Sequence, residues 1–291
     1  MIRRLFALPN RISDAPLEAE RVASLAEAYA FCEHIAEARW SDWPLFARFV
    51  PSPILPGLAA ICAFVRYADE LCTAVPEPAR QAAFNGWEDQ LVRAWHGEAD
   101  HPVFVALADA AAARELPITP LLELLTALRM DVPERRYATM EGLVGYLNCA
   151  AVPLGRLLLH LFGQHDPVRD RYAADFSTAL LLTHLLADVR DDARRGFVYL
   201  PQQDLAHFEV GEASLVAPVW SASVRNLMAF EAARARSLFL RGRPLLESVD
   251  GPLADIAVVL WRRGLALLAR IELEGDTHAA QLALATPELR A

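Results

Sequence analysis

The sequence predicts an all-α protein built as a single domain. Alanine, leucine, arginine and glutamate fill most segments, and these residues have high helix propensity. Apolar residues make up 54% of the 291 positions, which is enough to build a large buried core. Strand-like alternation is rare, and no stretch rich in glycine or serine divides the chain. We therefore expect one helical domain over residues 18–280, between an N-terminal arm at 1–17 and a C-terminal tail at 281–291.

Prolines and helix-start residues set the expected helix limits in the first half of the chain. Thr119 is a good N-cap, and Pro120 suits the first position of the helix that follows. Prolines at positions 44, 51, 53 and 56 interrupt the segment before the second expected helix. The expected helices are Pro16–Arg39, Pro56–Val75, Ala79–His96, His101–Glu115 and Thr119–Val132.

The second half is expected to hold longer and more apolar helices. The segment Met140–Phe162 is apolar almost all round, and Pro153 should kink it. A turn is expected at Asp166 and Pro167. The remaining expected helices are Arg169–Arg194, Val219–Arg241 and Leu253–Glu274.

Charge and cysteine usage limit the partners and the compartment. A formal net charge of −9 argues against a nucleic-acid partner, because phosphate binding needs a basic surface. The four cysteines lie far apart without a CxxC pair, as expected for small buried residues in a reducing cytoplasm. Pro9 interrupts the N-terminus too early for a signal peptide, and no run of about 18 uninterrupted apolar residues occurs. We expect a cytoplasmic protein, and leave open a peripheral contact with the inner face of the membrane.

The segment "LLADVRDDARRGFVYLPQQDL", residues 185–205, places aspartates directly behind leucines that look buried. Residues three or four apart share one face of a helix, and this face carries His184, Asp188, Asp192, Arg195 and Tyr199. Ion pairing with the nearby arginines at a solvated helix end is one explanation for the acids. Ion pairing does not require the leucines before them or the tyrosine after them.

A second expected helix, about 120 residues earlier, repeats this combination. Between Pro56 and Val75 one stripe holds Arg66, Asp69 and Thr73. Carboxylates one helical turn apart can hold Mg²⁺, a hard cation that prefers oxygen ligands and shares its shell with phosphates. The metal and the arginines would neutralise a diphosphate that acids alone repel. The combination suggests diphosphate chemistry.

Three segments resemble the squalene/phytoene synthase family in their order and spacing. "AFVRYADEL" is similar to the first aspartate motif, RxxDDxxD, and "DVRDDARRGFVYLP" to the second, DxxxD followed by RGRxYLP. "RMDVPERRYATMEGLVGYLNCAAVPLGRLLLHLFG" is similar to the segment between them, with its DxxxxRY, its tyrosine and its PxGR. This last segment is most similar to the HpnC-type hydroxysqualene synthases. The resemblance runs from about Ala36 to Leu205, and it implies an isoprenoid-synthase helical bundle around a central cavity.

The resemblance implies three groups of site residues. The implied metal ligands are Asp69, Asp188 and Asp192. The implied diphosphate-binding residues are Arg39, Arg66 and Arg195. The implied catalytic residues are Tyr146, Tyr199 and His184, and His184 is expected to orient a water near the diphosphate end.

The sequence departs from the family pattern at the diphosphate end. Thr73 stands where the last aspartate of the first motif is expected, and Phe197 where the second arginine of RGR is expected. His184 replaces an asparagine, and Leu181 replaces a glutamine. These changes remove one carboxylate, one cation and two amides. We therefore expect a site that binds fewer metal ions or phosphate groups than three Mg²⁺ ions and two diphosphates.

The resemblance implies Mg²⁺-dependent conversion of presqualene diphosphate into hydroxysqualene, with release of diphosphate. Head-to-head condensation of two prenyl diphosphates to presqualene, squalene or phytoene is the second expectation. Two explanations of another class stay open. One is a catalytically weak relative that binds a prenyl lipid or a partner enzyme, and the other is a helical scaffold with incidental acids.

The expected partners are presqualene or farnesyl diphosphate and neighbouring enzymes of the hopanoid pathway. No NADPH is expected, because the branch that the sequence resembles captures water and releases an alcohol. Nothing in the chain resembles a strand followed by GxGxxG and a helix, the usual seat of a dinucleotide. Squalene synthases that use NADPH lack this motif too, so the branch resemblance carries the expectation.

Overall fold

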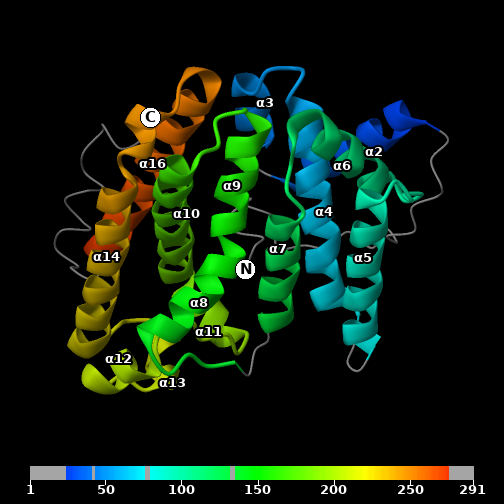
Figure 1. Cartoon of the computed structure of the whole chain (residues 1–291). Coiled ribbons are helices and arrows are strands. Elements are labelled where there is room, and N and C mark those ends of the chain that lie inside the picture. The colour runs from blue at the N-terminus through cyan, green and yellow to red at the C-terminus, as the bar shows by residue number, and fades with distance from the viewer. Residues whose placement is uncertain (1–23, 41–42, 76–78, 132–134, 275–291) are drawn as a thin grey trace.

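All regular structure in the described part of the chain is helical (Figure 1). The computed structural model describes residues 24–40, 43–75, 79–131 and 135–274, without the side chains of residues 39, 45, 72–74 and 274. Over these ranges the predicted all-α fold is confirmed. The predicted arm, the predicted tail and the predicted helix start at Pro16 lie outside the described residues and stay predictions.

Most helices begin and end close to the predicted positions. Those of the first half are α2 (Leu25–Arg39), α3 (Trp43–Phe49), α4 (Leu55–Ala74), α5 (Ala79–Trp95), α6 (Pro102–Arg114) and α7 (Thr119–Met130). Those of the second half are α8 (Met140–Ala150), α9 (Val152–Leu161), α10 (Pro167–Ala187), α11 (Val189–Arg194), α12 (Gln202–His207), α13 (Glu212–Leu215), α14 (Ala222–Gly242), α15 (Leu245–Ser248) and α16 (Gly251–Glu274). The sequence does not predict α3, α12, α13 or α15, because helices so short show no period of their own.

The predicted single helix over 140–162 and the predicted cap at Thr119 are both corrected by the structure. Instead of one kinked helix over 140–162, the chain forms α8 and α9, which meet at Ala151. Pro153 lies in the first turn of α9, where a missing N–H removes no helical bond. Thr119 is already helical and Ile118 takes the N-cap position without a side-chain bond, so the predicted threonine cap is wrong.

The predicted helix 169–194 is also two helices, α10 and α11, separated by Asp188. Asp166 caps the start of α10 by accepting two backbone N–H bonds, at 2.8 and 2.9 Å. At the break, the Asp188 N–H still bonds the His184 carbonyl at 3.1 Å, and the Asp192 N–H bonds the Asp188 carbonyl at 2.9 Å. The two carboxylates therefore keep the spacing of one helical turn despite the break.

Helices α4 and α10 run in the same direction, so their C-terminal ends lie at the same end of the bundle (Figure 1). Helix α9 lies between them in this view and contacts both. Helices α14 and α16 also pack against α10. Since α10 is surrounded by other helices, its buried residues are distributed around its circumference.

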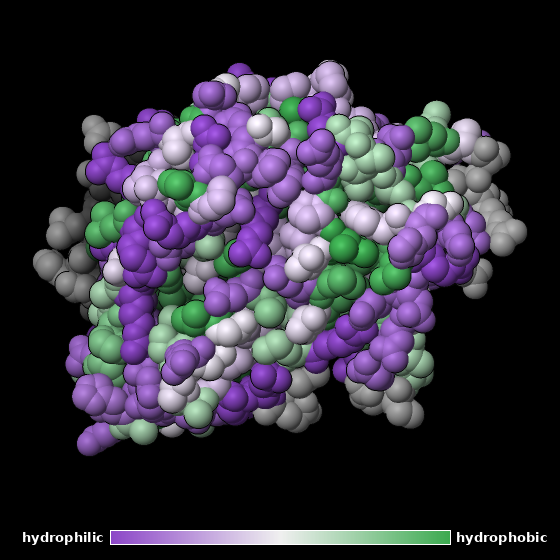
Figure 2. Space-filling view, viewed as in Figure 1, coloured by the Kyte–Doolittle hydropathy of each residue, from purple (hydrophilic) through white to green (hydrophobic). Residues whose placement is uncertain are grey.

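One stretch of the described chain is long and apolar enough to cross a membrane by length and composition. It covers Met140–Leu161, has a mean hydropathy of 1.4, and 56% of its window is buried inside the molecule. Its helices α8 and α9 pack against α7 and α10, and this core packing accounts for their apolar character. The face of the molecule in Figure 2 is mostly hydrophilic, with apolar residues in small groups.

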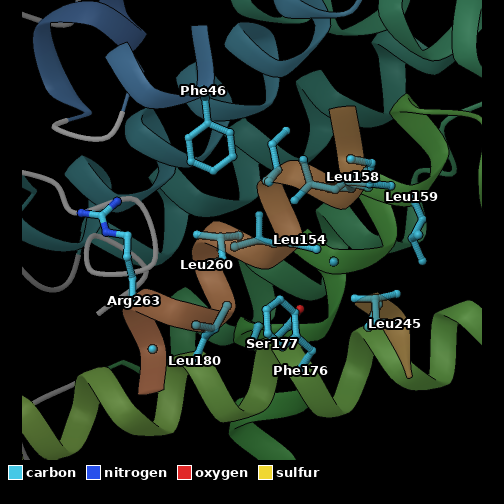
Figure 3. A pocket seen from close by; sticks show the side chains of 18 of the residues that line it. Phe46, Leu154, Leu158, Leu159, Phe176, Ser177, Leu180, Leu245, Leu260 and Arg263 are labelled. Atoms are coloured by element: carbon cyan, nitrogen blue, oxygen red, sulfur yellow. The ribbon is translucent and has the colours of Figure 1, made fainter. Parts of the chain in front are cut away.

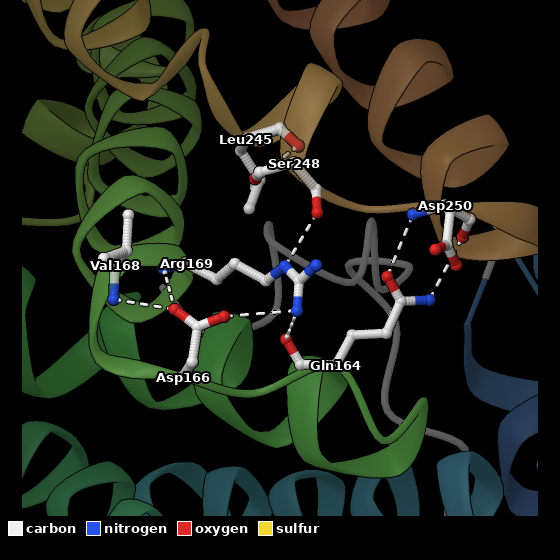
Figure 4. A network of polar contacts seen from close by, with 7 residues as sticks. All are labelled: Gln164, Asp166, Val168, Arg169, Leu245, Ser248 and Asp250. Carbon is white, nitrogen blue, oxygen red and sulfur yellow. Dashed lines mark hydrogen bonds and ion pairs between the residues drawn. The ribbon is translucent and has the colours of Figure 1, made fainter.

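A polar network fastens the turn before α10 to the segment before α16 (Figure 4). Arg169 Nε donates to the Ser248 carbonyl at 2.7 Å, and its Nη1 lies 3.1 Å from Asp166 Oδ2. The Gln164 amide exchanges two hydrogen bonds with the backbone of Asp250, at 2.9 and 3.1 Å. These bonds hold the short helix α15 against α10.

Gly242 marks a close approach between α14 and α10. A Cβ added to Gly242 would lie 2.7 Å from the backbone nitrogen of Phe176 and 2.8 Å from its Cα, closer than real Cβ atoms come. Backbone atoms cannot turn aside as a flexible side chain can. The absence of a side chain at Gly242 therefore permits the packing of these two helices.

Gly242→Ala should destabilise the fold by about 1–3 kcal/mol, the usual cost of overpacking, measured by chemical denaturation. Gly86→Ala is the matched control, because Gly86 is an exposed residue of α5 with nothing within 4 Å of an added Cβ. It should stabilise the protein by about 0.5–1 kcal/mol, since alanine favours a helix over glycine. Equal effects of the two substitutions would contradict the close approach.

Arg234 of α14 lies between two buried carboxylates. Its Nη1 donates to Asp204 of α12 and to Glu231 Oε1, the latter at 2.8 Å. Glu231 is fully buried, and its Oε2 has no hydrogen-bond partner among the described residues. Burial raises the pKa of Glu231 to about 7, because this effect exceeds the opposing charge of Arg234.

The raised pKa of Glu231 should make the fold less stable as the pH rises. Its folded pKa of about 7 exceeds the ordinary 4.5, so its stabilising contribution is complete below pH 4.5 and is lost as the pH rises through 7. The loss should reach at most about 3.5 kcal/mol, at about 1.4 kcal/mol per pKa unit. Glu231→Gln should abolish it. Urea unfolding between about pH 5 and 8 should then show a free-energy difference that grows in favour of the variant, and a constant difference would refute the prediction.

Candidate active site

A largely apolar cavity of about 420 Å³ lies between α3, α4, α9, α10, α15 and α16 (Figure 3). Its wall includes Phe46 of α3, Leu154 and Leu158 of α9, Leu180 of α10 and Leu260 of α16. Side chains from helices far apart in the sequence thus enclose one space. Its lining suits a long apolar ligand.

The cavity has one polar end, toward the C-terminal ends of α4 and α10. His184 of α10 and Arg263 and Arg270 of α16 line this end. In Figure 3, Arg263 lies on the side of Leu180, away from Leu245 at the other end of the cavity. The cavity therefore offers an apolar interior and a cationic end.

Both cavity walls lead to an aspartate by helical steps. On α4, Ile61 lines the cavity, and Asp69 follows it by eight residues. On α10, His184 lines the cavity, and Asp188 follows it by four residues. Residues at these steps share a helix face. Since α4 and α10 run in the same direction (Figure 1), each aspartate lies nearer the C-terminal end of its helix than the cavity-lining residue before it.

Arg66 joins the acids of the first motif in one buried cluster. Its guanidinium lies 2.7 Å from Glu70 Oε1 and 3.6 Å from Asp69 Oδ2, and each of the three residues is at most 5% exposed. Glu70 is rotated about 100° from Asp69 around the helix, yet the Arg66 side chain reaches both. Arg66 Nη1 has no hydrogen-bond acceptor among the described residues. This buried nitrogen is the one that lies 3.6 Å from Asp69 Oδ2, within ion-pair distance but without a hydrogen bond.

The acids of the second motif have different surroundings. Asp192 is 3% exposed and lies 2.5 Å from Arg195, whereas Asp191 is exposed and lies 2.7 Å from Arg194. Ion pairs therefore form here, as the alternative explanation predicts. A solvated helix end would leave both acids exposed, however, so ion pairing alone does not account for the burial of Asp192.

Three tyrosines and a phenylalanine form an aromatic column next to the second motif. The rings of Tyr146 and Tyr199 lie 5.9 Å apart at 13°, with Tyr137 packed on Tyr146 and Phe197 on Tyr199. Tyr199 donates to Asp131 Oδ1 at 2.5 Å. Burial, with the charge of Asp131 adding to it, raises the pKa of Tyr146 well above the usual range. The predicted catalytic tyrosines therefore lie together, and Tyr146 is a neutral phenol.

Phe197 replaces the expected arginine with a ring that extends this aromatic column. Its ring lies 6.2 Å from that of Tyr199 at 15°, and the Arg195 guanidinium lies 6.0 Å from its centroid. Arg195 in turn bonds Asp192. The chain thus keeps a cation beside the second motif through Arg195, although position 197 itself carries no charge.

The structure brings predicted site residues together in three sets. These are Arg66 with Asp69, Asp188 and Asp192 with Arg195, and Tyr146 with Tyr199. Within the described ranges, no group of three or more histidine, cysteine or acidic residues is placed to hold a metal ion. The metal-ligand roles therefore stay predictions. The side chains of Arg39 and Thr73 lie outside the described residues.

The sequence shows Glu70 next to Asp69 in the first motif, but sequence reasoning did not single out two other residues that the structure places at the site, Asp131 and Arg263. Glu70 follows Arg66 by four residues, a spacing that predicts an ion pair. Asp131 belongs to the DxxxxRY segment, but that pattern does not say what its side chain contacts. No sequence signal connects Arg263 of α16 with the distant α10.

The described residues form an all-helical bundle with an apolar cavity, and carboxylates and arginines lie toward one end of it. These features define a class of protein that binds a long apolar chain carrying an anionic head group. The particular family follows from the sequence. A family model described as squalene/phytoene synthase matches residues 38–289, most of the chain. The chain belongs to the squalene/phytoene synthase family, and its fold is the isoprenoid-synthase fold. It is an enzyme of the family that acts on prenyl diphosphates.

The chain is also similar to named proteins and to solved structures. The 15-cis-phytoene synthase of Synechococcus elongatus is 32% identical over 234 residues, which cover 75% of each chain. The structure of squalene synthase HpnC from Alicyclobacillus acidocaldarius has a TM-score of 0.82 and 33% identity, covering 86% of this chain and 95% of that chain. A dehydrosqualene synthase in complex with ligand, with a TM-score of 0.74 and 22% identity over 85% and 96% of the two chains, shares the fold.

Asp188→Asn should slow the Mg²⁺-dependent release of diphosphate from a prenyl diphosphate on the order of 10³-fold, which corresponds to an activation free energy higher by several kcal/mol. Folding stability should change little. The reason is the loss of one charge at the acid-bearing end of α10. Asp191→Asn is the matched control, because Asp191 is a neighbouring exposed acid whose side chain pairs with Arg194. It should leave the rate unchanged. A near-normal rate for Asp188→Asn would favour the ion-pair explanation.

Proposed function

We propose that the chain converts presqualene diphosphate into hydroxysqualene, with release of diphosphate. The observation that carries the proposal is the apolar cavity that ends at His184, one helical turn before Asp188. A long prenyl chain fits the cavity while its diphosphate reaches the acid-bearing ends of α4 and α10. The likeness in sequence and fold to squalene synthase HpnC supports this choice among the reactions of the family.

Mg²⁺ is the cofactor of the proposed reaction, and the residues present fit it. In proteins Mg²⁺ usually takes one or two carboxylates and completes its shell with water and substrate phosphates. Asp188 and Asp192 keep the spacing of one turn, and Asp69 is the carboxylate expected from α4. A group of three protein acids is therefore not required. When bound, Mg²⁺ supplies Lewis-acid assistance to the leaving diphosphate.

The residues of the chain bind the diphosphate and protect the carbocation. Arg66 Nη1, which is buried and makes a 3.6 Å ion pair with Asp69 but no hydrogen bond among the described residues, donates to a diphosphate oxygen. This bond strengthens as the carbon–oxygen bond breaks and negative charge collects on the diphosphate. The leucine-lined cavity keeps bulk water from the carbocation. His184, at the polar end, orients the single water that is captured.

Head-to-head condensation of two prenyl diphosphates is the second candidate. The similarity to a phytoene synthase over 75% of the chain favours it, because that reaction uses two prenyl diphosphates. A prenyl-lipid-binding relative without turnover is the candidate of another class. The residues Thr73 and Phe197 favour it, because each removes a charge that the family pattern places at the diphosphate end.

Product identification separates these candidates. The purified protein is incubated with Mg²⁺ and, separately, with farnesyl, geranylgeranyl or presqualene diphosphate, and the lipid products are identified by mass spectrometry. A hydroxylated C30 product from presqualene diphosphate alone supports the first proposal. Presqualene, squalene or phytoene from the linear substrates supports the second. Tight binding without any product supports the third.

The proposed water capture predicts that NADPH changes nothing. Capture of water forms a carbon–oxygen bond without reduction, so no hydride donor is consumed. Presqualene diphosphate and Mg²⁺, with and without NADPH, should therefore give the same hydroxylated C30 product at the same rate. The measurement is the mass of the lipid together with NADPH absorbance. Squalene formed only in the presence of NADPH would overturn the proposed product.

A further inference from the structure

Arg270 lines the cavity from α16, a helix that none of the sequence motifs covers. The cavity-lining row of α16 runs through Leu260 and Leu267 to Arg270, with the spacing of one helix face. Arg270 is exposed, and its side chain has no hydrogen bond or ion pair among the described residues. A row that begins with apolar side chains therefore ends in a guanidinium that a ligand of the cavity can reach.

Arg270 lies at the level of the acid-bearing end of α10. The two helices run in the same direction, because the polar network ties the chain just before α16 to the start of α10 (Figure 4). Farther along they meet at Gly264, where an added Cβ would lie 2.8 Å from Leu180 Cδ2. Each helix rises about 1.5 Å per residue. Arg270 lies six residues beyond this contact and Asp188 eight, so the two are within about one helical turn of each other along the bundle.

The arginines predicted to bind the diphosphate are already paired with acids, where their side chains are described. Arg66 is shared by two carboxylates of the first motif, and Arg195 bonds Asp192. Phe197 removes a further cation from this end. A guanidinium suits a diphosphate well, because it can bind two phosphate oxygens with parallel, charge-assisted hydrogen bonds. Arg270 offers this group without an acid that competes for it among the described residues.

We propose that Arg270 is a further substrate-binding residue, whose guanidinium binds the diphosphate oxygens at the polar end of the cavity. The inference rests on the proposed function, which brings a prenyl diphosphate into this cavity. The contact does not depend on which product follows, because the diphosphate is present before any carbon–oxygen bond breaks. In this chain, α16 thus supplies positive charge that the second motif lacks at position 197.

Calorimetric titration of the purified full-length protein tests the contact without turnover. The probes, each with Mg²⁺, are inorganic diphosphate and farnesyl thiolodiphosphate, whose carbon–sulfur bond resists ionisation. Arg270→Gln should weaken the binding of both about tenfold, because a charge-assisted hydrogen bond is lost. Arg270→Lys should weaken it only about threefold, since the charge remains and the two-pronged geometry is lost. Affinities of Arg270→Gln within about twofold of wild type, or no binding of either probe by the wild type, overturn the inference.

Arg262→Gln is the matched control. Arg262 is an exposed arginine of the same helix that does not line the cavity, so this substitution removes an equal charge without removing the proposed contact. It should leave both affinities unchanged. Equal weakening by Arg262→Gln and Arg270→Gln would mean that the overall charge of α16 attracts the anion, and would refute the contact.

Farnesol, the same prenyl chain without the diphosphate, controls for damage to the cavity. It should bind the wild type and Arg270→Gln equally, because the proposed contact is to the diphosphate alone. A loss of farnesol binding as large as the loss for the thiolodiphosphate would show that the substitution disturbs the apolar wall, and the inference would fail.

Steady-state kinetics separate this inference from the proposed function. With presqualene diphosphate, Arg270→Gln should raise KM about tenfold and change kcat less than about threefold, because the contact already exists in the bound substrate. A hydroxylated product formed with an unchanged KM would refute the role of Arg270 and leave the proposed function intact. Thiolodiphosphate binding that depends on Arg270, without any product from presqualene diphosphate, would refute the proposed function and support the role of Arg270.

Discussion

Burying carboxylates beside an apolar cavity is the constraint on which the rest of this site depends. A buried acid without a partner is strongly destabilising, and removing one member of a buried pair costs several kcal/mol. The acids of the site have such partners: Asp69 and Glu70 share Arg66, Asp192 bonds Arg195, and Asp131 accepts the Tyr199 hydroxyl. These pairs let the acids stand at the edge of the core, and they direct donors and acceptors toward the polar end of the cavity.

The cavity exists because the helices around α10 pack tightly in some places and stand apart in others. Gly155 brings α9 close to α10, since a Cβ there would lie 2.5 Å from Ser177 Oγ. Gly242 does the same for α14. The Gln164 and Arg169 bonds hold α15 in place, and Leu245 of α15 lines the apolar end of the cavity. Close packing at these points fixes the walls, while the leucine and alanine side chains between them leave room for a ligand.

The aromatic column shows how this chain changes the family pattern at the diphosphate end. Replacing an arginine by Phe197 removes a charge, but the ring packs on Tyr199 and supports the guanidinium of Arg195. The positive charge that position 197 lacks is therefore supplied by Arg195, which also bonds Asp192. On the opposite wall, Arg66 joins Glu70 and Asp69 in one cluster, so the first motif keeps two buried acids. Compensation between neighbours explains how the motifs diverge while the acid-bearing helix ends persist.

The sequence by itself determined the helical class, most helix limits, the family and the residue types of the site, because each depends on local periodicity or on motifs a few residues long. Asp188 and Asp192 share a face through the spacing of one helical turn, which survives the break in the helix. Only the tertiary structure decided that Tyr146 stacks on Tyr199, that Asp131 binds the Tyr199 hydroxyl, and that Arg263 reaches the end of the cavity. Those contacts join residues on different helices. Their distances depend on how the helices pack, and helix packing leaves no periodic trace in the chain.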